Sequence, residues 1–139
     1  MAFCLDASIA VAAFMPNPAR RQAQDFVAET LGRGEQFVAP PLLLAETTSV
    51  LRRYVHLGTL QHEQAVAALQ DLLASPLRVD GRPHIYARAL DLARRLGHGR
   101  AYDVQYLAVA EMENCAVVTL DHGLHESAQA LGIASRLIA

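Results

Sequence analysis

The 139-residue sequence contains no lysine, few cysteines and no long apolar run. Its twelve basic residues are all arginine, and 14 acidic residues outnumber them, which gives a formal net charge of −2. This near-neutral balance argues against binding long stretches of nucleic acid by charge alone, although it leaves a local arginine patch open. With 19% charged residues, eight glycines and six prolines, the composition excludes a collagen, a disordered tail and a coiled coil.

The two cysteines, Cys4 and Cys115, are far apart and have no CxxC motif or histidine spacing around them. This argues against a disulfide framework and against a zinc site. No apolar run approaches the ~18 residues of a membrane-spanning helix, and Asp6 interrupts the first segment before the apolar region of a signal peptide can form. We therefore expect a cytoplasmic protein without a membrane partner.

Hydrophobic residues make up 53% of the chain, and the mean hydropathy is +0.18. A chain of this length buries roughly two thirds of its unfolded surface, so it can form a packed core. We expect one domain spanning residues 1–139. Because the apolar fraction lies slightly above the usual range, we also expect an exposed apolar patch that serves a partner.

Short apolar segments alternate with longer segments of helical periodicity. Strands are expected at residues 2–5, 37–39, 77–79, 115–120 and 136–138. Helices are expected at about 9–15, 19–31, 42–58, 60–75, 85–96, 101–113 and 122–131, with Pro16 and Pro18 breaking the chain after the first. This alternation predicts an α/β fold in which a parallel sheet of four to five strands is covered by helices on both faces.

Two acids directly follow predicted strands. Asp6 comes after the first strand and Asp121 after the clearest of the later ones. The carboxyl ends of parallel strands are where open α/β sheets bind ligands. Taken singly, each acid is better explained as a cap of the following helix than as a functional group, and Asp103, near the start of another helix, suits the helix dipole.

Glu46 is harder to explain by local structure. Its neighbours one turn away on the predicted helix are apolar, so its carboxylate projects from an apolar face. A buried carboxylate needs a partner, and Arg52 and Arg53 on the same helix point elsewhere or lie two turns on. Asp103 has the same character, because its helical face is also apolar.

Carboxylates that crowd into one crevice repel one another unless a cation or protons neutralise them. A set of oxygen ligands favours Mg²⁺, or Mn²⁺. A metal site of this kind suits the hydrolysis of phosphodiesters. The acids concerned are Asp6, Glu46, Asp103 and Asp121.

Four fragments carry these acids, and 40, 57 and 18 residues separate the acids in turn. The fragments are Leu5-Asp6-Ala7-Ser8, Ala45-Glu46 followed by Val50-Leu51, Ala101-Tyr102-Asp103-Val104-Gln105-Tyr106-Leu107-Ala108, and Val117-Val118-Thr119-Leu120-Asp121-His122-Gly123-Leu124. Together they resemble the PIN domain family, and most nearly its VapC-type toxin ribonucleases. The resemblance extends over nearly the whole chain.

The resemblance implies a PIN-like three-layer fold and an Mg²⁺-dependent endoribonuclease that is the toxin of a type II toxin–antitoxin pair. It implies a cognate VapB-type antitoxin, an RNA substrate, a homodimer and a higher toxin–antitoxin assembly. Asp6 and Asp103 then match the direct metal ligands. Glu46 and Asp121 match positions that hold metal-bound water, a second metal or the attacking water, and Ser8 and Thr119 match the small hydroxyl positions beside them.

The segment from Gly97 to Arg100 lies just before the helix of Asp103. It lacks a phosphate-loop pattern, and a glycine helix cap beside a solvated arginine explains it as well as a functional role does. Arg100 is nevertheless a candidate for binding a substrate phosphate. Tyr102 and Tyr106 are expected in the core rather than stacked on bases.

Three alternatives stay open. The chain could be a non-toxin PIN nuclease in RNA processing or a catalytically silent PIN-like binding module. A phosphotransfer enzyme with Asp6 as nucleophile would want a second acid where Ser8 stands. Metal-dependent cleavage of RNA separates a nuclease from a binding module, and trapping of a phospho-aspartate would favour phosphotransfer.

Overall fold

Five parallel strands form the centre of the structure, a computed structural model that describes residues 2–15 and 21–138. They are β1 (Ala2–Leu5), β2 (Gln36–Ala39), β3 (Leu77–Val79), β4 (Ala116–Thr119) and β5 (Ser135–Leu137). Their spatial order is β3-β2-β1-β4-β5, and every neighbouring pair is parallel. The prediction of a parallel sheet is confirmed, with five strands.

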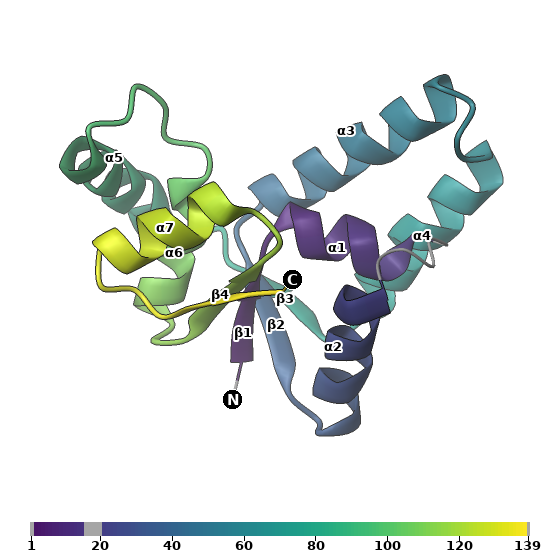
Figure 1. The fold of residues 1–139 in the computed structure, drawn as a ribbon, viewed down its shortest axis with the longest axis horizontal. Coiled ribbons are helices and arrows are strands. Elements are labelled where there is room, and N and C mark those ends of the chain that lie inside the picture. Colours follow the sequence, from purple (N-terminus) through teal and green to yellow (C-terminus); the bar gives the residue numbers. More distant parts are fainter. Residues whose placement is uncertain (1, 16–20, 139) are drawn as a thin grey trace.

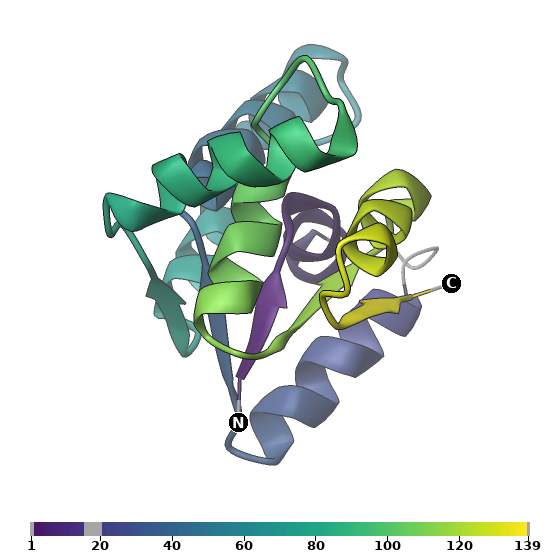
Figure 2. The same cartoon turned by 90° about the vertical axis from the view of Figure 1, so that its left-hand side faces the viewer.

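Seven helices connect the described strands and cover both faces of the sheet. They are α1 (Ala7–Phe14), α2 (Arg21–Gly32), α3 (Leu42–His56), α4 (His62–Ala74), α5 (His84–Leu96), α6 (Val104–Met112) and α7 (His122–Ala130). In Figure 1, α1 to α4 lie on one side of the sheet and α5 to α7 on the other. Figure 2 views the molecule from the second side, where α5 and α6 lie in front of the sheet. This is the expected three-layer arrangement.

Two boundaries differ from the sequence prediction in ways that bear on the site. Helix α1 begins at Ala7, directly after Asp6, and α6 begins only at Val104. Asp103 therefore precedes its helix instead of lying in the first turn. Pro16 and Pro18, together with residues 19 and 20 of the predicted second helix, lie outside the described residues.

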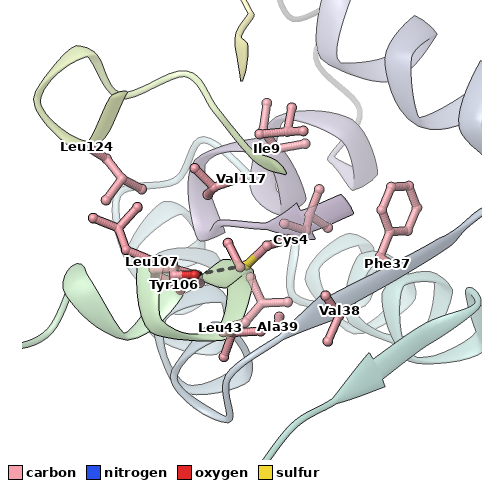
Figure 3. Packing of buried hydrophobic residues seen from close by; sticks show 14 of the residues in the cluster. Cys4, Ile9, Phe37, Val38, Ala39, Leu43, Tyr106, Leu107, Val117 and Leu124 are labelled. Atoms are coloured by element: carbon pink, nitrogen blue, oxygen red, sulfur yellow. Dashed lines mark hydrogen bonds between the residues drawn. The ribbon is translucent and has the colours of Figure 1, made fainter. Parts of the chain in front are cut away.

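The main core lies on both faces of β1 and its neighbours. Figure 3 shows how Val38 of β2 and Val117 of β4 pack around Cys4, whose thiol donates to the Tyr106 carbonyl oxygen at 3.3 Å. This contact fixes α6 against β1. A second, smaller cluster joins α1, α3 and α4, and its buried members are Met15, Leu51, Leu60, Ala65 and Ala68. Within the described residues, no helix is both long and apolar enough to span a bilayer.

Candidate metal centre

Asp6 and Asp121 lie at the same edge of the sheet, because each follows one of two adjacent parallel strands. Both cap helices. Oδ1 of Asp6 accepts from the backbone N–H of Ile9 at 3.1 Å, and Oδ1 of Asp121 accepts from that of Gly123 at 2.8 Å. The capping interpretation holds for both acids, and it also fixes the direction in which each carboxylate points.

Two hydroxyl groups hold the Asp6 carboxylate from either side. The Ser8 hydroxyl donates to Oδ1 at 2.6 Å, and the Thr119 hydroxyl donates to Oδ2 at 2.5 Å. Each hydroxyl oxygen also accepts a backbone N–H at 2.9 Å, Ser8 from Leu120 and Thr119 from Asp121. The network therefore ties the end of β1 to the end of β4.

Asp6 is buried, with an exposed fraction of 6%. Burial raises its pKa above the ordinary value, and the negative charge of Asp121 raises it further. The hydrogen bonds from Ser8, Thr119 and Ile9 oppose this shift. The effect of burial on the pKa is thus larger than that of the three hydrogen bonds. A nearby cation would therefore stabilise the ionised form of Asp6.

Glu46 finds its partner in Tyr106 rather than in an arginine. The Tyr106 hydroxyl donates to Oε1 of Glu46 at 2.7 Å, and Tyr106 itself is buried, as expected. Glu46 is half-buried, so the expectation of a buried carboxylate on an apolar face was wrong in degree. The reason is that α3 faces the open pocket at this position instead of the packed core.

Asp103 is exposed, which contradicts the expectation that it shares the apolar face of α6. It precedes the helix, and its side chain makes no capping hydrogen bond. Partial loss of water raises its pKa, and Asp121 raises it further, while His98 opposes the shift. Its carboxylate is therefore held near Asp121 and free to bind a ligand.

The four acids line one pocket of about 450 Å³, which we call the acidic pocket. They reach it from four different places in the fold: the end of β1, helix α3, the residue before α6, and the end of β4. The structure thus brings together all four acids and Ser8. The Thr119 side chain is buried behind Asp6. Arg100 is not among the lining residues.

The acidic pocket suits a hard divalent cation by its donor chemistry, since it is lined by four carboxylates and by no histidine or cysteine. An ionised carboxylate has about four acceptor directions, so Asp6 keeps one open on Oδ2 beyond its three hydrogen bonds. Among the described residues, no three His, Cys, Asp or Glu side chains are grouped closely enough to hold a metal by themselves. Mg²⁺ commonly takes one or two carboxylates and keeps several waters, so the residues fit it.

Two residues near the acids were not identified from the sequence. Tyr106 was expected only as a core residue, yet its hydroxyl reaches Glu46. The sequence did not single out His98, yet its charge opposes the rise in the pKa of Asp103. Tyr106 follows Asp103 by three positions, which places the two on one side of α6, but nothing in the sequence connects either of them to α3.

Comparison with known proteins gives consistent results. The family model described as PIN domain matches residues 3–129. A VapC ribonuclease of Mycobacterium bovis is 32% identical over 129 residues, covering 91% of each chain, and Ribonuclease VapC9 of Mycobacterium tuberculosis matches equally well.

Solved structures share the fold at lower identity. VapBC2 from Rickettsia felis, bound to a DNA fragment from its promoter, has a TM-score of 0.73 at 17% identity and covers 100% of both chains. VapC20 of Mycobacterium tuberculosis, a toxin that cleaves the sarcin–ricin loop, has a TM-score of 0.72 at 19% identity, covering 95% of this chain and 96% of that one. The chain belongs to the PIN domain family and is a relative of the VapC ribonucleases.

Proposed function

We propose that this protein is a metal-dependent endoribonuclease of the VapC type and the toxin of a toxin–antitoxin pair. One observation carries the proposal: four carboxylates from separate parts of the fold line a single open pocket. Helix capping accounts for Asp6 and Asp121, but it accounts for neither Glu46, which lies inside α3, nor Asp103, which makes no capping hydrogen bond. The names of the curated relatives support the choice of RNA as substrate.

We propose that Asp6 and Asp103 hold the metal directly, with Mg²⁺ favoured and Mn²⁺ as its substitute. When bound, such an ion supplies an activated water and neutralises charge on the phosphate. Ser8 and Thr119 fix the orientation of Asp6 through their two hydrogen bonds. They also keep its carboxylate an acceptor, because both hydroxyl oxygens already accept a backbone N–H.

In this proposal Glu46 and Asp121 act through water. The hydrogen bond from Tyr106 occupies Oε1 of Glu46, and Oε2, which has no hydrogen bond within the described residues, is left as an acceptor for a water. Asp121 uses Oδ1 to cap α7, with acceptances from Gly123 and Leu124, so Oδ2 plays the equivalent role. Both acids can then orient the attacking water against the phosphate.

We propose a VapB-type antitoxin as the protein partner. Solved structures with this fold include VapBC complexes from Rickettsia felis and Haemophilus influenzae, which supports a partner of that kind. Large apolar side chains are exposed just after α3, on α4 and on α5, namely Leu57, Leu73 and Leu90. Such side chains are suited to an antitoxin and to a homodimer contact. Co-expression with the product of the adjacent gene, followed by size-exclusion chromatography, tests both interactions.

The decisive test of the activity is cleavage of total cellular RNA with and without Mg²⁺, with the new 5′ ends mapped by sequencing. We expect discrete cleavage sites that vanish in EDTA and with Asp6→Asn. Uncleaved RNA in every condition would favour the catalytically silent PIN-like module. A phosphorylated aspartate instead of cleaved RNA would favour phosphotransfer.

A further inference from the structure

A second hollow adjoins the acidic pocket over the segment that connects α5 to α6. It has a volume of about 610 Å³, and we call it the loop hollow; its lining residues are Gly97, His98, Gly99, Arg100, Tyr102, Asp103 and Val104. A third hollow of about 330 Å³ lies between His98, Asp103 and Asp121. Asp103 lines all three hollows, so they form one continuous depression that leads from the acids to the loop.

Tyr102 is placed unlike the core residue that the sequence suggested. Its side chain is 61% exposed, whereas Tyr106, four residues later, is 2% exposed. An exposed aromatic ring beside a depression gives a flat apolar surface on which an unpaired base can stack.

Arg100 supplies the cation that a nucleic-acid strand needs near four carboxylates. It is exposed and makes no ion pair with any described residue. Five other arginines are neutralised by acids, namely Arg33, Arg78, Arg82, Arg88 and Arg94. An unpaired guanidinium binds phosphate oxygens in bidentate fashion, which offsets the repulsion between the substrate and the acidic pocket.

Gly99 leaves the backbone beside Arg100 open to close approach. Gly97 has a positive φ of 70° and ends α5, so the fold requires glycine there. At Gly99 no positive φ is found, and an added Cβ would meet no atom within 4 Å. Neither conformation nor packing demands glycine at this position, and close approach of a ligand to the backbone is a further reason for one.

We propose that Gly99, Arg100 and Tyr102 form a subsite for one unpaired nucleotide next to the scissile phosphate, in which the Tyr102 ring stacks on the base and Arg100 binds a phosphate. This inference rests on the proposed function, because it names the form of RNA that the acidic pocket receives. This chemistry favours an unpaired base, since a base in a duplex must first be unpaired and unstacked before it can lie on the ring.

The test measures binding of a fluorescent single-stranded RNA oligomer to the cleavage-inactive Asp6→Asn protein with Mg²⁺. Arg100→Ala and Tyr102→Ala should each weaken binding about tenfold, and Tyr102→Phe should retain most of it because the ring remains. Arg100→Ala should also reduce the slope of log K against log salt by about 0.7, as expected for one lost phosphate contact. Gly99→Val should weaken binding without lowering the Tm.

Matched controls come from the other end of the molecule. Arg33→Ala removes the same charge before β2, at the amino edge of the sheet, and Tyr86→Ala removes an exposed ring from the first turn of α5. Both should bind like the parent. Loop variants that bind like the Asp6→Asn parent, or that lose binding to a duplex of the same sequence equally, would overturn the subsite alone. A wild-type protein that neither binds nor cleaves RNA would overturn the proposed function, and the subsite with it.

Discussion

The Tyr106 hydroxyl donates a 2.7 Å hydrogen bond to Glu46 across 60 positions of sequence, and it joins α6 to α3 at the acidic pocket. Burial raises the pKa of Tyr106, and the Glu46 carboxylate raises it further. The phenol therefore keeps its proton and remains a donor throughout the physiological pH range. The contact therefore keeps Oε1 of Glu46 occupied over that range of pH.

Tyr106→Phe should lower kcat about tenfold and leave KM nearly unchanged, because Glu46 loses its orientation and not its charge. The free energy of unfolding should fall by about 1 kcal/mol for the lost hydrogen bond. Steady-state kinetics and urea denaturation measure the two effects. Tyr86→Phe, which alters an exposed ring elsewhere, is the control. If Tyr106→Phe left kcat unchanged, cleavage would not depend on the hydrogen bond that orients Glu46.

Thr119→Val and Thr47→Val make the same chemical change with opposite expected results. Removal of the Thr119 hydroxyl leaves Asp6 Oδ2 and the Asp121 N–H without a partner, which should cost about 1–3 kcal/mol of unfolding free energy. The Thr47 hydroxyl is buried and has no hydrogen-bond partner in the described structure. Its removal should raise the free energy of unfolding by up to about 1 kcal/mol. Equal effects of the two substitutions in urea denaturation would contradict the Asp6 network.

Asp103→Asn should raise the Tm of the metal-free protein at neutral pH. The folded pKa of Asp103 lies above its unfolded value, so between the two values the folded state binds more protons. The contribution of Asp103 to stability therefore falls as the pH rises from about 4 through the folded pKa. The Tm difference between variant and wild type, measured in EDTA, should widen over that range and then level off. A difference that does not vary with pH would mean that neither burial nor Asp121 disfavours the ionised form of Asp103.

Mg²⁺ should raise the Tm of the wild-type protein and not that of Asp6→Asn. A ligand that binds only the folded state stabilises it by about 2.7 kcal/mol at 100 times its Kd. Mn²⁺ should act similarly, and Zn²⁺ at equal occupancy should not restore cleavage, because the charged donors that line the pocket are all carboxylates. A titration followed by differential scanning fluorimetry measures the shift. Equal shifts in wild type and Asp6→Asn would place the metal elsewhere.

The sequence predicted the sheet because its strands are short, apolar and bounded by clear breaks. Asp6 and Asp121 were placed at the carboxyl edge correctly, since adjacency to a strand is a local property. The start of α6 was set three residues too early, because Ala101 and Tyr102 suit a helix as well as a loop.

Contacts between elements that are distant in the chain could not be predicted from the sequence. Periodicity showed that Glu46 needed a partner, but only the packing of α6 against α3 reveals that the partner is Tyr106. The exposure of Asp103 and Tyr102 was underestimated for the same reason. An apolar face of a helix is buried only if another element packs against it. No described element covers these two residues: Asp103 lines the acidic pocket, and Tyr102 lines the loop hollow.

The most direct test of the metal-site proposal is the single-turnover rate of RNA cleavage by Asp6→Asn, Asp103→Asn and the double variant, with Thr47→Val as control. If the two acids serve one site, each single variant should lose cleavage by at least ~10³-fold, and the double variant should lose little more, because groups that act as a unit are not additive. Circular dichroism should show the wild-type fold in all of them. Near-wild-type cleavage by either single variant would contradict the proposal.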